Sequence, residues 1–73
     1  MMEVPLMTLK VELDLEEDGR WLADVVDVPG AMAYGETRDV AAGNAEAIAL
    51  RAIADQVEHR EIPRPDKIEF SLK

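Results

Sequence analysis

Carboxylates are the commonest side chains in this sequence that could perform chemistry. Pairs of them can act as general acids and bases or hold divalent cations. Those in the predicted strands, such as Asp14 and Asp24, occupy outward positions of an alternating pattern, where solubility explains them. We therefore predict no catalytic residue, no metal site and no cofactor. The carboxylates considered are Asp14, Asp18, Asp24, Asp27, Glu36, Asp39 and Glu46.

The sequence also lacks most of the residue types that nucleophilic catalysis needs. The chain has no cysteine, one histidine (His59) and one serine (Ser71), which leaves no credible pair of nucleophile and base. His59 falls near the expected C-terminal end of a helix, where the helix dipole favours a cation. The sequence is therefore expected to encode a binding protein and not an enzyme.

The stretch DVPGAMAYGET, residues 27–37, is the remaining candidate for ligand binding. It matches neither G-x-G-x-x-G nor a P-loop, and no Lys-Ser or Lys-Thr pair follows its glycines. The formal net charge of −8 opposes direct binding to nucleic acid, because affinity for phosphate comes largely from lysine and arginine. An acidic surface instead favours a basic partner.

Length and composition indicate one small domain over residues 1–73. A chain of this size buries only about 60% of the surface that its unfolded form exposes, and no disulfide compensates. We therefore expect a homo-oligomer, most simply a two-fold dimer. The acidic N-terminus is unlike a signal peptide and no apolar run reaches membrane-spanning length. These features predict a cytoplasmic protein without membrane contact.

Alternation predicts two strands and the hairpin that joins them. Residues 7–15 carry apolar side chains at every odd position, as in a half-buried strand. A second strand over residues 20–27 follows an Asp18-Gly19 pair. Only a three-residue loop over 17–19, with Gly19 in the left-handed conformation, keeps one face of the pair apolar. The resulting register places Leu15 opposite Trp21, Leu13 opposite Ala23 and Val11 opposite Val25.

Turn and cap signals delimit the next elements. Pro29-Gly30 breaks the second strand. The short apolar run of residues 31–34 fits a third strand that ends at Gly35. Thr37 is a suitable N-cap, because its hydroxyl can accept from a backbone N–H of the first turn. A helix is expected from Arg38 to about residue 60.

This helix is apolar on two sides, which is typical of a helix that is buried on both. The main stripe is expected to face the core, and the second stripe lies nearly on the other side. The main stripe consists of Val40, Gly43, Ala47, Leu50, Ala54 and Val57, widened by Ile53; the second consists of Ala41, Ala45, Ile48 and Ala52.

Pro63 and Pro65 are expected to stop the helix, because proline cannot continue it. Residues 67–73 alternate again, with Ile68, Phe70 and Leu72 inward, and form a fourth strand. The sequence therefore predicts an α+β fold with the element order β-β-β-α-β.

Large apolar side chains also occur where the pattern predicts exposure. Leu22 and Val26 fall on the outer face of the second strand, which indicates that this face is covered. Met32 and Tyr34 in the third strand and Ile48 in the second helical stripe complete the predicted interface with a partner or a second copy. Whether the sheet face or the helical stripe is used stays open.

Several short motifs follow one another in an order that spans nearly the whole chain. They are Glu17-Asp18-Gly19, Asp27-Val28-Pro29-Gly30, Gly35-Glu36-Thr37, Asn44, Glu46-Ala47-Ile48 and Ile62-Pro63-Arg64-Pro65. This order resembles the N-terminal domain of the HicB antitoxin family. The signature residues would then serve structure and not chemistry: Gly19, Pro29, Gly30, Gly35, Thr37, Pro63 and Pro65.

The resemblance implies a two-layer fold like a partial RNase H, with a mostly antiparallel sheet, the last strand beside the first and one helix packed across it. It also implies a partner, a small basic mRNA interferase toxin of the HicA type, which carries the catalytic histidine and which the antitoxin blocks. HicB antitoxins usually continue into a DNA-binding domain; this sequence ends at Lys73, so we expect none here. The alternative is an orphan HicB-like protein that self-associates and has no toxin.

Overall fold

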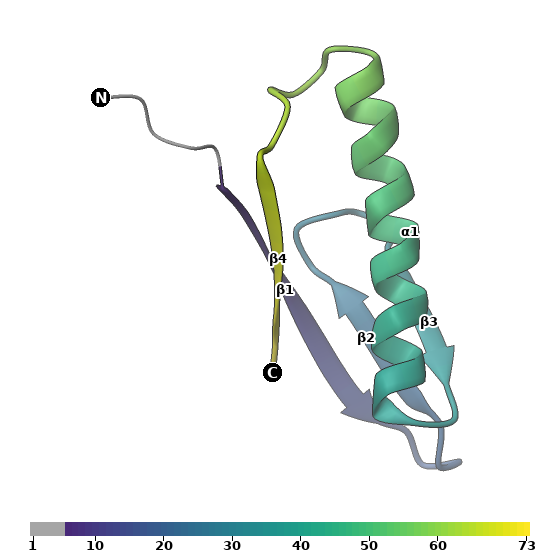
Figure 1. The fold of residues 1–73 in the computed structure, drawn as a ribbon. Coiled ribbons are helices and arrows are strands. Elements are labelled where there is room, and N and C mark those ends of the chain that lie inside the picture. Colours follow the sequence, from purple (N-terminus) through teal and green to yellow (C-terminus); the bar gives the residue numbers. More distant parts are fainter. Residues whose placement is uncertain (1–5) are drawn as a thin grey trace.

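The computed structural model describes residues 6–73 and has the predicted α+β order. The elements are β1 (Leu6–Leu15), β2 (Trp21–Val25), β3 (Met32–Gly35), α1 (Arg38–Glu58) and β4 (Lys67–Leu72), as Figure 1 shows. The start of the acidic N-terminal stretch, residues 1–5, lies outside the described part. Within residues 6–73, no helix is both long and apolar enough to cross a bilayer.

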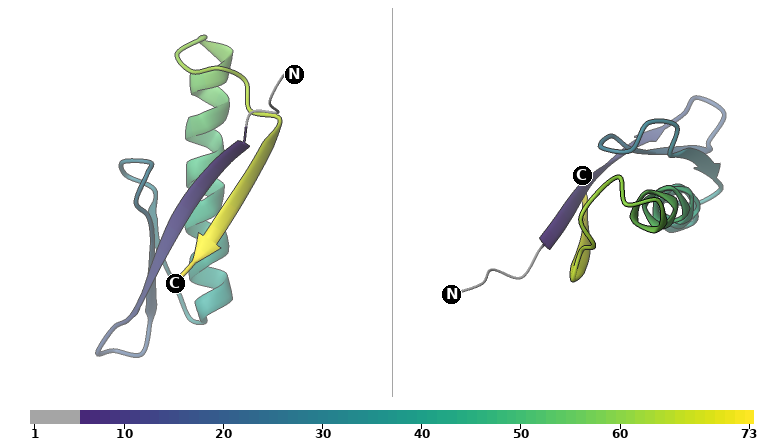
Figure 2. Two further views of the ribbon diagram at one scale, coloured as in Figure 1. Left: turned by 90° about the vertical axis from the view of Figure 1, so that its left-hand side faces the viewer. Right: turned by 90° about the horizontal axis from the view of Figure 1, so that it is seen from above.

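The four strands form one sheet in the order β3-β2-β1-β4. β1 and β2 are antiparallel, as are β2 and β3, whereas β4 runs parallel to β1. The last strand therefore lies beside the first, and α1 forms the second layer (Figure 2). The predicted two-layer arrangement, with a mostly antiparallel sheet, is confirmed.

The predicted hairpin register is confirmed. Leu15 lies opposite Trp21, Leu13 opposite Ala23 and Val11 opposite Val25. The loop over residues 17–19 closes through two backbone bonds: the Glu16 N–H donates to the Arg20 carbonyl at 2.7 Å, and the Gly19 N–H donates to the Glu16 carbonyl at 3.0 Å. Gly19 has φ +88°, a conformation that a side chain would strain.

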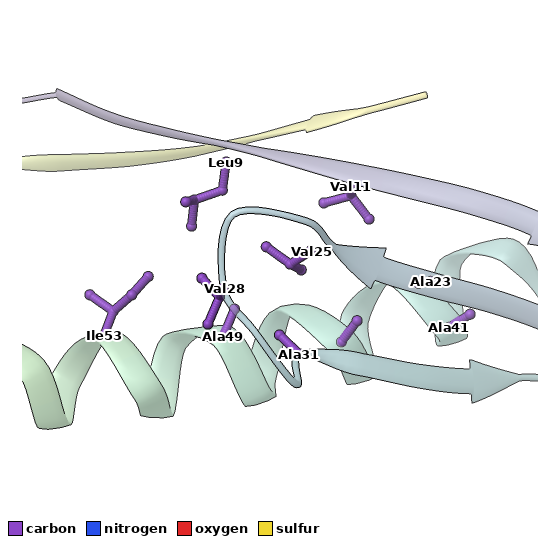
Figure 3. Close-up of a cluster of buried hydrophobic side chains, with 10 residues drawn as sticks. Leu9, Val11, Ala23, Val25, Val28, Ala31, Ala41, Ala49 and Ile53 are labelled. Carbon is purple, nitrogen blue, oxygen red and sulfur yellow. The ribbon is translucent and has the colours of Figure 1, made fainter.

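The core lies between α1 and the inner face of the sheet, and its side chains are small (Figure 3). Val11 and Val25, which are cross-strand partners, are its largest fully buried side chains. The remaining buried residues of this cluster are Leu9, Ala23, Val28, Ala31, Ala41, Ala45, Ala49 and Ile53. Small side chains bury little area each, so this core is thin, as the chain length predicts.

The predicted main stripe of the helix is wrong. α1 buries Ala41, Ala42, Ala45, Ala49 and Ile53. Ala41 and Ala45 belong to the predicted second stripe, and its other two residues, Ile48 and Ala52, are partly buried against the core. Of the bulky residues in the predicted main stripe, Ile53 is buried and Val57 packs against the core, whereas Val40 is 49% exposed and Leu50 is 42% exposed. The alanine face packs against the sheet because its short side chains allow the helix axis to come closer, which a face of valine and leucine would prevent.

Leu15 has the predicted inward orientation but is mostly exposed, because it lies at the end of the sheet. The pairing of β4 with β1 ends at Val11. Beyond that point, β1 has a neighbouring strand on one side only. Alternation predicted the face of Leu15 correctly, and the extent of the neighbouring strands decided its burial.

The helix start is closely packed against the end of β3. Thr37 is the N-cap, and its hydroxyl accepts from the Val40 N–H at 3.1 Å, as predicted. Gly35, two residues earlier, lies directly against the first turn of α1. A Cβ at this position would overlap the Ala41 backbone nitrogen and lie 2.8 Å from the Ala41 Cα, which is closer than van der Waals contact.

The helix ends before the prolines that were expected to stop it. Arg60 adopts φ +58° and donates its N–H to the Val57 carbonyl, while Glu61 donates to the Gln56 carbonyl. These two bonds define a Schellman cap. Pro63 and Pro65 therefore shape the connection to β4, and the helix itself ends through its own backbone.

Gly35→Ala is expected to destabilise the protein by about 2–4 kcal/mol, because the added methyl group forces α1 away from β3. The free energy of unfolding, from urea or thermal denaturation, checks this. Gly43→Ala is the matched control, since a Cβ at that exposed helical position meets no atom within 4 Å. It is expected to stabilise α1 by about 1 kcal/mol. Similar effects of both substitutions would contradict the close packing at Gly35.

Candidate protein interface

The outer face of β2 and β3 gathers three of the residues that were predicted to form an interface. Leu22 lies opposite Tyr34, and Met32 lies opposite Asp24 on the same face. Met32 is 48% exposed and Tyr34 is 45% exposed. α1 covers only the other face of the sheet (Figure 2). We call Leu22, Met32 and Tyr34, together with Arg20, the outer patch.

Arg20 holds the aromatic part of this patch in place. Its guanidinium lies 4.2 Å from the centroid of the Tyr34 ring, a cation–π geometry, and its Nε donates to an Asp18 carboxylate oxygen at 2.7 Å. The Asp18 carboxylate also accepts from the Arg20 N–H. These hydrogen bonds, first from the backbone and then from the side chain of Arg20, hold the pKa of Asp18 below its usual value. The hairpin loop is thereby tied to the patch.

Carboxylates border the outer patch on the side of β1. Glu12 lies opposite Asp24, and Asp14 lies opposite Leu22. Like charges directly opposite each other on one face of a sheet are destabilising. The pair formed by Glu12 and Asp24 therefore costs the isolated domain stability, and a cationic group brought near it would relieve the repulsion.

Val26, also predicted at the interface, lies just beyond β2 and continues the alternation of Leu22 and Asp24. It is 40% exposed, and its N–H donates to the Lys10 carbonyl at 3.1 Å. The Lys10 N–H in turn donates to the Asp27 carboxylate at 2.8 Å. Val26 thus extends the apolar surface from the outer patch toward the middle of β1.

Ile48 is separated from these residues. It is half-buried and packs against the core cluster on the inner side of the sheet. Ile48 was predicted at the interface because it is a bulky side chain in an alanine-rich stripe. In the structure, this stripe belongs to the side of α1 that packs against the sheet. The structure therefore brings together four of the five predicted interface residues and places the fifth within the second layer.

The signature residues of the 27–37 stretch form turns and close contacts. Gly30 has φ +84°, and the Ala31 N–H donates to the Val28 carbonyl across Pro29-Gly30, as in a type II turn. Asn44 of α1 donates from its side-chain amide to the Tyr34 carbonyl at 3.1 Å. This stretch thus connects the sheet to the helix.

An apolar groove, which the sequence did not predict, runs between the second half of α1 and the start of β4. Its volume is about 560 Å³. Leu50, Ala54 and Val57 line one side, and they belong to the helical stripe that was expected to face the core. The other lining residues are Ile53, Glu58, Arg64, Pro65 and Ile68. These residues of the predicted main stripe therefore form an apolar surface as expected, but the surface lines a groove beside β4 and not the centre of the core.

The described residues hold one group of potential metal ligands, Asp55, Glu58 and His59 at the end of α1. All three side chains are exposed. The His59 Nδ1 lies 2.8 Å from the Asp55 carbonyl and 3.3 Å from the Asp55 carboxylate, so its position follows from capping the helix. Exposed carboxylates are common without a metal, and this group receives no metal assignment.

Comparison of the chain with protein-family models, curated proteins and solved structures finds no match.

Glu46→Gln is expected to raise the melting temperature at pH 7. Burial raises the pKa of the Glu46 carboxyl, so the charged form is destabilising in the folded state. The folded protein then binds a proton more tightly than the unfolded chain, and its stability falls as pH rises through this pKa. The gain from Glu46→Gln should disappear below about pH 4, where glutamate is protonated in both states.

Thermal unfolding of both proteins between pH 3 and pH 7 measures this difference. Glu61→Gln, which removes an exposed carboxylate, controls for the change in net charge. An equal gain from Glu61→Gln would show that the effect is one of net charge and not of burial.

Proposed function

We propose that this protein is a HicB-like antitoxin module that binds a small basic mRNA interferase toxin of the HicA type and neutralises it. The observation that carries the proposal is the outer patch: half-buried Leu22 of β2 and exposed Met32 and Tyr34 of β3, with carboxylates along one side. A large apolar patch on a small domain marks an interaction surface.

Charge supports a basic partner for this surface. The chain has a net charge of −8, and the opposed Glu12 and Asp24 carboxylates stand beside the apolar centre. Lysine or arginine from a partner would remove their repulsion while apolar contacts form over Met32 and Tyr34. Complementary charge would also raise the association rate and select against acidic partners.

In this proposal the chain acts by covering the toxin and performs no reaction itself. The residues that resemble the HicB signature form turns and caps, such as Gly19, Gly30 and Thr37, and they shape the scaffold that carries the outer patch. The toxin supplies the RNA-cleaving residues, and bound antitoxin would deny RNA access to them. The complex would form in the cytoplasm, where messenger RNA is found.

An orphan, self-associating protein is the second candidate. The observation that favours it is the apolar groove, which gives the domain a second uncovered surface on the opposite side of the sheet. A protein that only self-associates would use either surface without a basic partner.

The antitoxin proposal predicts a specific capture and a specific inhibition. The purified chain, immobilised, is expected to retain one small basic protein at equal stoichiometry from nuclease-treated lysate of its native host. That protein, purified, should cleave RNA, and the free chain should abolish the cleavage at a 1:1 ratio.

Tyr34→Asp and Met32→Asp are expected to weaken this inhibition by at least about 100-fold, because each puts a charge into a desolvated apolar contact. Val40→Asp is the matched control, since Val40 is as exposed as Met32 but lies on α1. A captured protein without RNase activity, or equal inhibition by all three variants, would contradict the proposal.

A further inference from the structure

Within residues 6–73, no strand pairs with the outer edge of β4. The Lys73 N–H donates to the Val11 carbonyl at 3.0 Å, which directs the backbone of odd-numbered residues toward β1. Backbone groups alternate in direction along a strand. The N–H and C=O groups of Ile68, Phe70 and Leu72 therefore point away from β1, toward the edge of the sheet that β4 forms.

The opposite edge of the sheet, formed by β3, is less open to pairing with another strand than β4 is. On β3, the outward Met32 N–H donates to the Gly30 carbonyl, and the outward Tyr34 carbonyl accepts from the Asn44 side chain. Natural proteins blunt exposed edges with proline, bulges, short strands or charges. β3 has four residues, whereas β4 has six, pairs with β1 without a bulge and contains no proline. The charged side chains of β4, Lys67 and Glu69, form an ion pair with each other. β4 is the edge that is open to another strand.

Charge around β4 differs from that of the rest of the chain. Residues 64–73 contain three basic and two acidic side chains, a net charge of +1, whereas residues 1–63 carry −9. Two copies of an acidic protein repel each other over most of their surfaces. The β4 edge is where a second copy can approach without that repulsion.

We propose that a second copy of this chain pairs its β4 with this β4, antiparallel, about a two-fold axis at Phe70. The sheets of the two copies then form one continuous eight-stranded sheet. This register places Phe70 opposite itself, Ile68 opposite Leu72 of the partner subunit, and Glu69 opposite Ser71 of the partner subunit. The backbone N–H and C=O groups of Ile68, Phe70 and Leu72, which point away from β1, then form the hydrogen bonds between the two copies.

Neighbouring registers are less favourable. An axis at Glu69 would oppose two Glu69 carboxylates, which is destabilising. An axis at Ser71 would leave Ile68 without a partner in the other strand. An axis at Ile68 would place Asp66 opposite Phe70 of the partner subunit, although it gains pairs between Lys67 and Glu69. The axis at Phe70 is the one that matches apolar side chains with apolar side chains along the inner face.

The apolar groove supports the same occupant. Ile68 lines the groove, and in the proposed register Leu72 of the partner subunit lies beside it on the inner face. Leu72, which is 39% exposed in the isolated chain, would thereby be covered. The pairing thus adds apolar burial to the backbone hydrogen bonds, which is what a small domain with a thin core lacks.

This inference is independent of the proposed antitoxin function, because the β4 edge and the outer patch lie at different places on the sheet. The chain contains no cysteine, so introduced cysteines report the pairing without background. Glu69→Cys and Ser71→Cys, both exposed, are mixed and mildly oxidised. The disulfide between the two different chains is expected to outnumber each like-with-like disulfide several-fold.

Light scattering at about 100 µM, well above the dissociation constants of specific dimers, is expected to give twice the 8.1 kDa chain mass. Leu72→Lys should give the monomer mass, because it buries a charge beside Ile68 of the partner subunit. Leu15→Lys is the control. It introduces the same charge at an exposed leucine at the end of β1, beyond the part that pairs with β4, and should stay dimeric. A monomeric wild type, a dimeric Leu72→Lys, or a dominant like-with-like disulfide would overturn the proposal.

Discussion

The close approach of α1 to the sheet is the constraint on which the rest of the structure depends. It requires an alanine face on the helix and a glycine at position 35, where a Cβ would collide with the Ala41 backbone. Close packing of small groups recovers dispersion contacts that a wider gap would lose. The same choice limits the apolar area that the core can bury, because alanine contributes little.

A thin core leaves apolar residues elsewhere on the surface. Val40 is exposed at the start of α1, Leu50 lines the groove beside β4, and Met32 and Tyr34 occupy the uncovered face of the sheet. A single helix cannot cover a four-stranded sheet: α1 packs mainly over β2 and β3 (Figures 1 and 2). The uncovered surfaces fall into two groups, the outer patch and the region around β4, and they differ in charge. The outer patch adjoins opposed carboxylates, whereas the β4 segment is nearly neutral.

This difference in charge assigns different partners to the two surfaces in our proposals. Apolar contact supplies affinity at both, and electrostatics selects what can approach. A basic toxin suits the outer patch, and a second copy suits the β4 edge. Because the two surfaces do not overlap, a dimer joined through β4 would present two outer patches, and each proposal can fail without the other.

Local features of the sequence determined much of this fold. The requirement that one face of the hairpin stay apolar is enough to pair Leu15 with Trp21 and to place Gly19 in the turn. The hydroxyl of Thr37 likewise predicts the start of the helix, because a helix cap involves only a few residues. The sequence also identified Leu22, Val26, Met32 and Tyr34 as apolar side chains on the outer face of the sheet, since alternation defines both faces of a strand. Only the tertiary structure decided which side of α1 faces the core. Helical periodicity finds two stripes but cannot weigh the bulk of valine and leucine against the closer approach that alanine allows. The groove and the open β4 edge follow from that packing and from the pairing of β4 with β1, which no local pattern encodes.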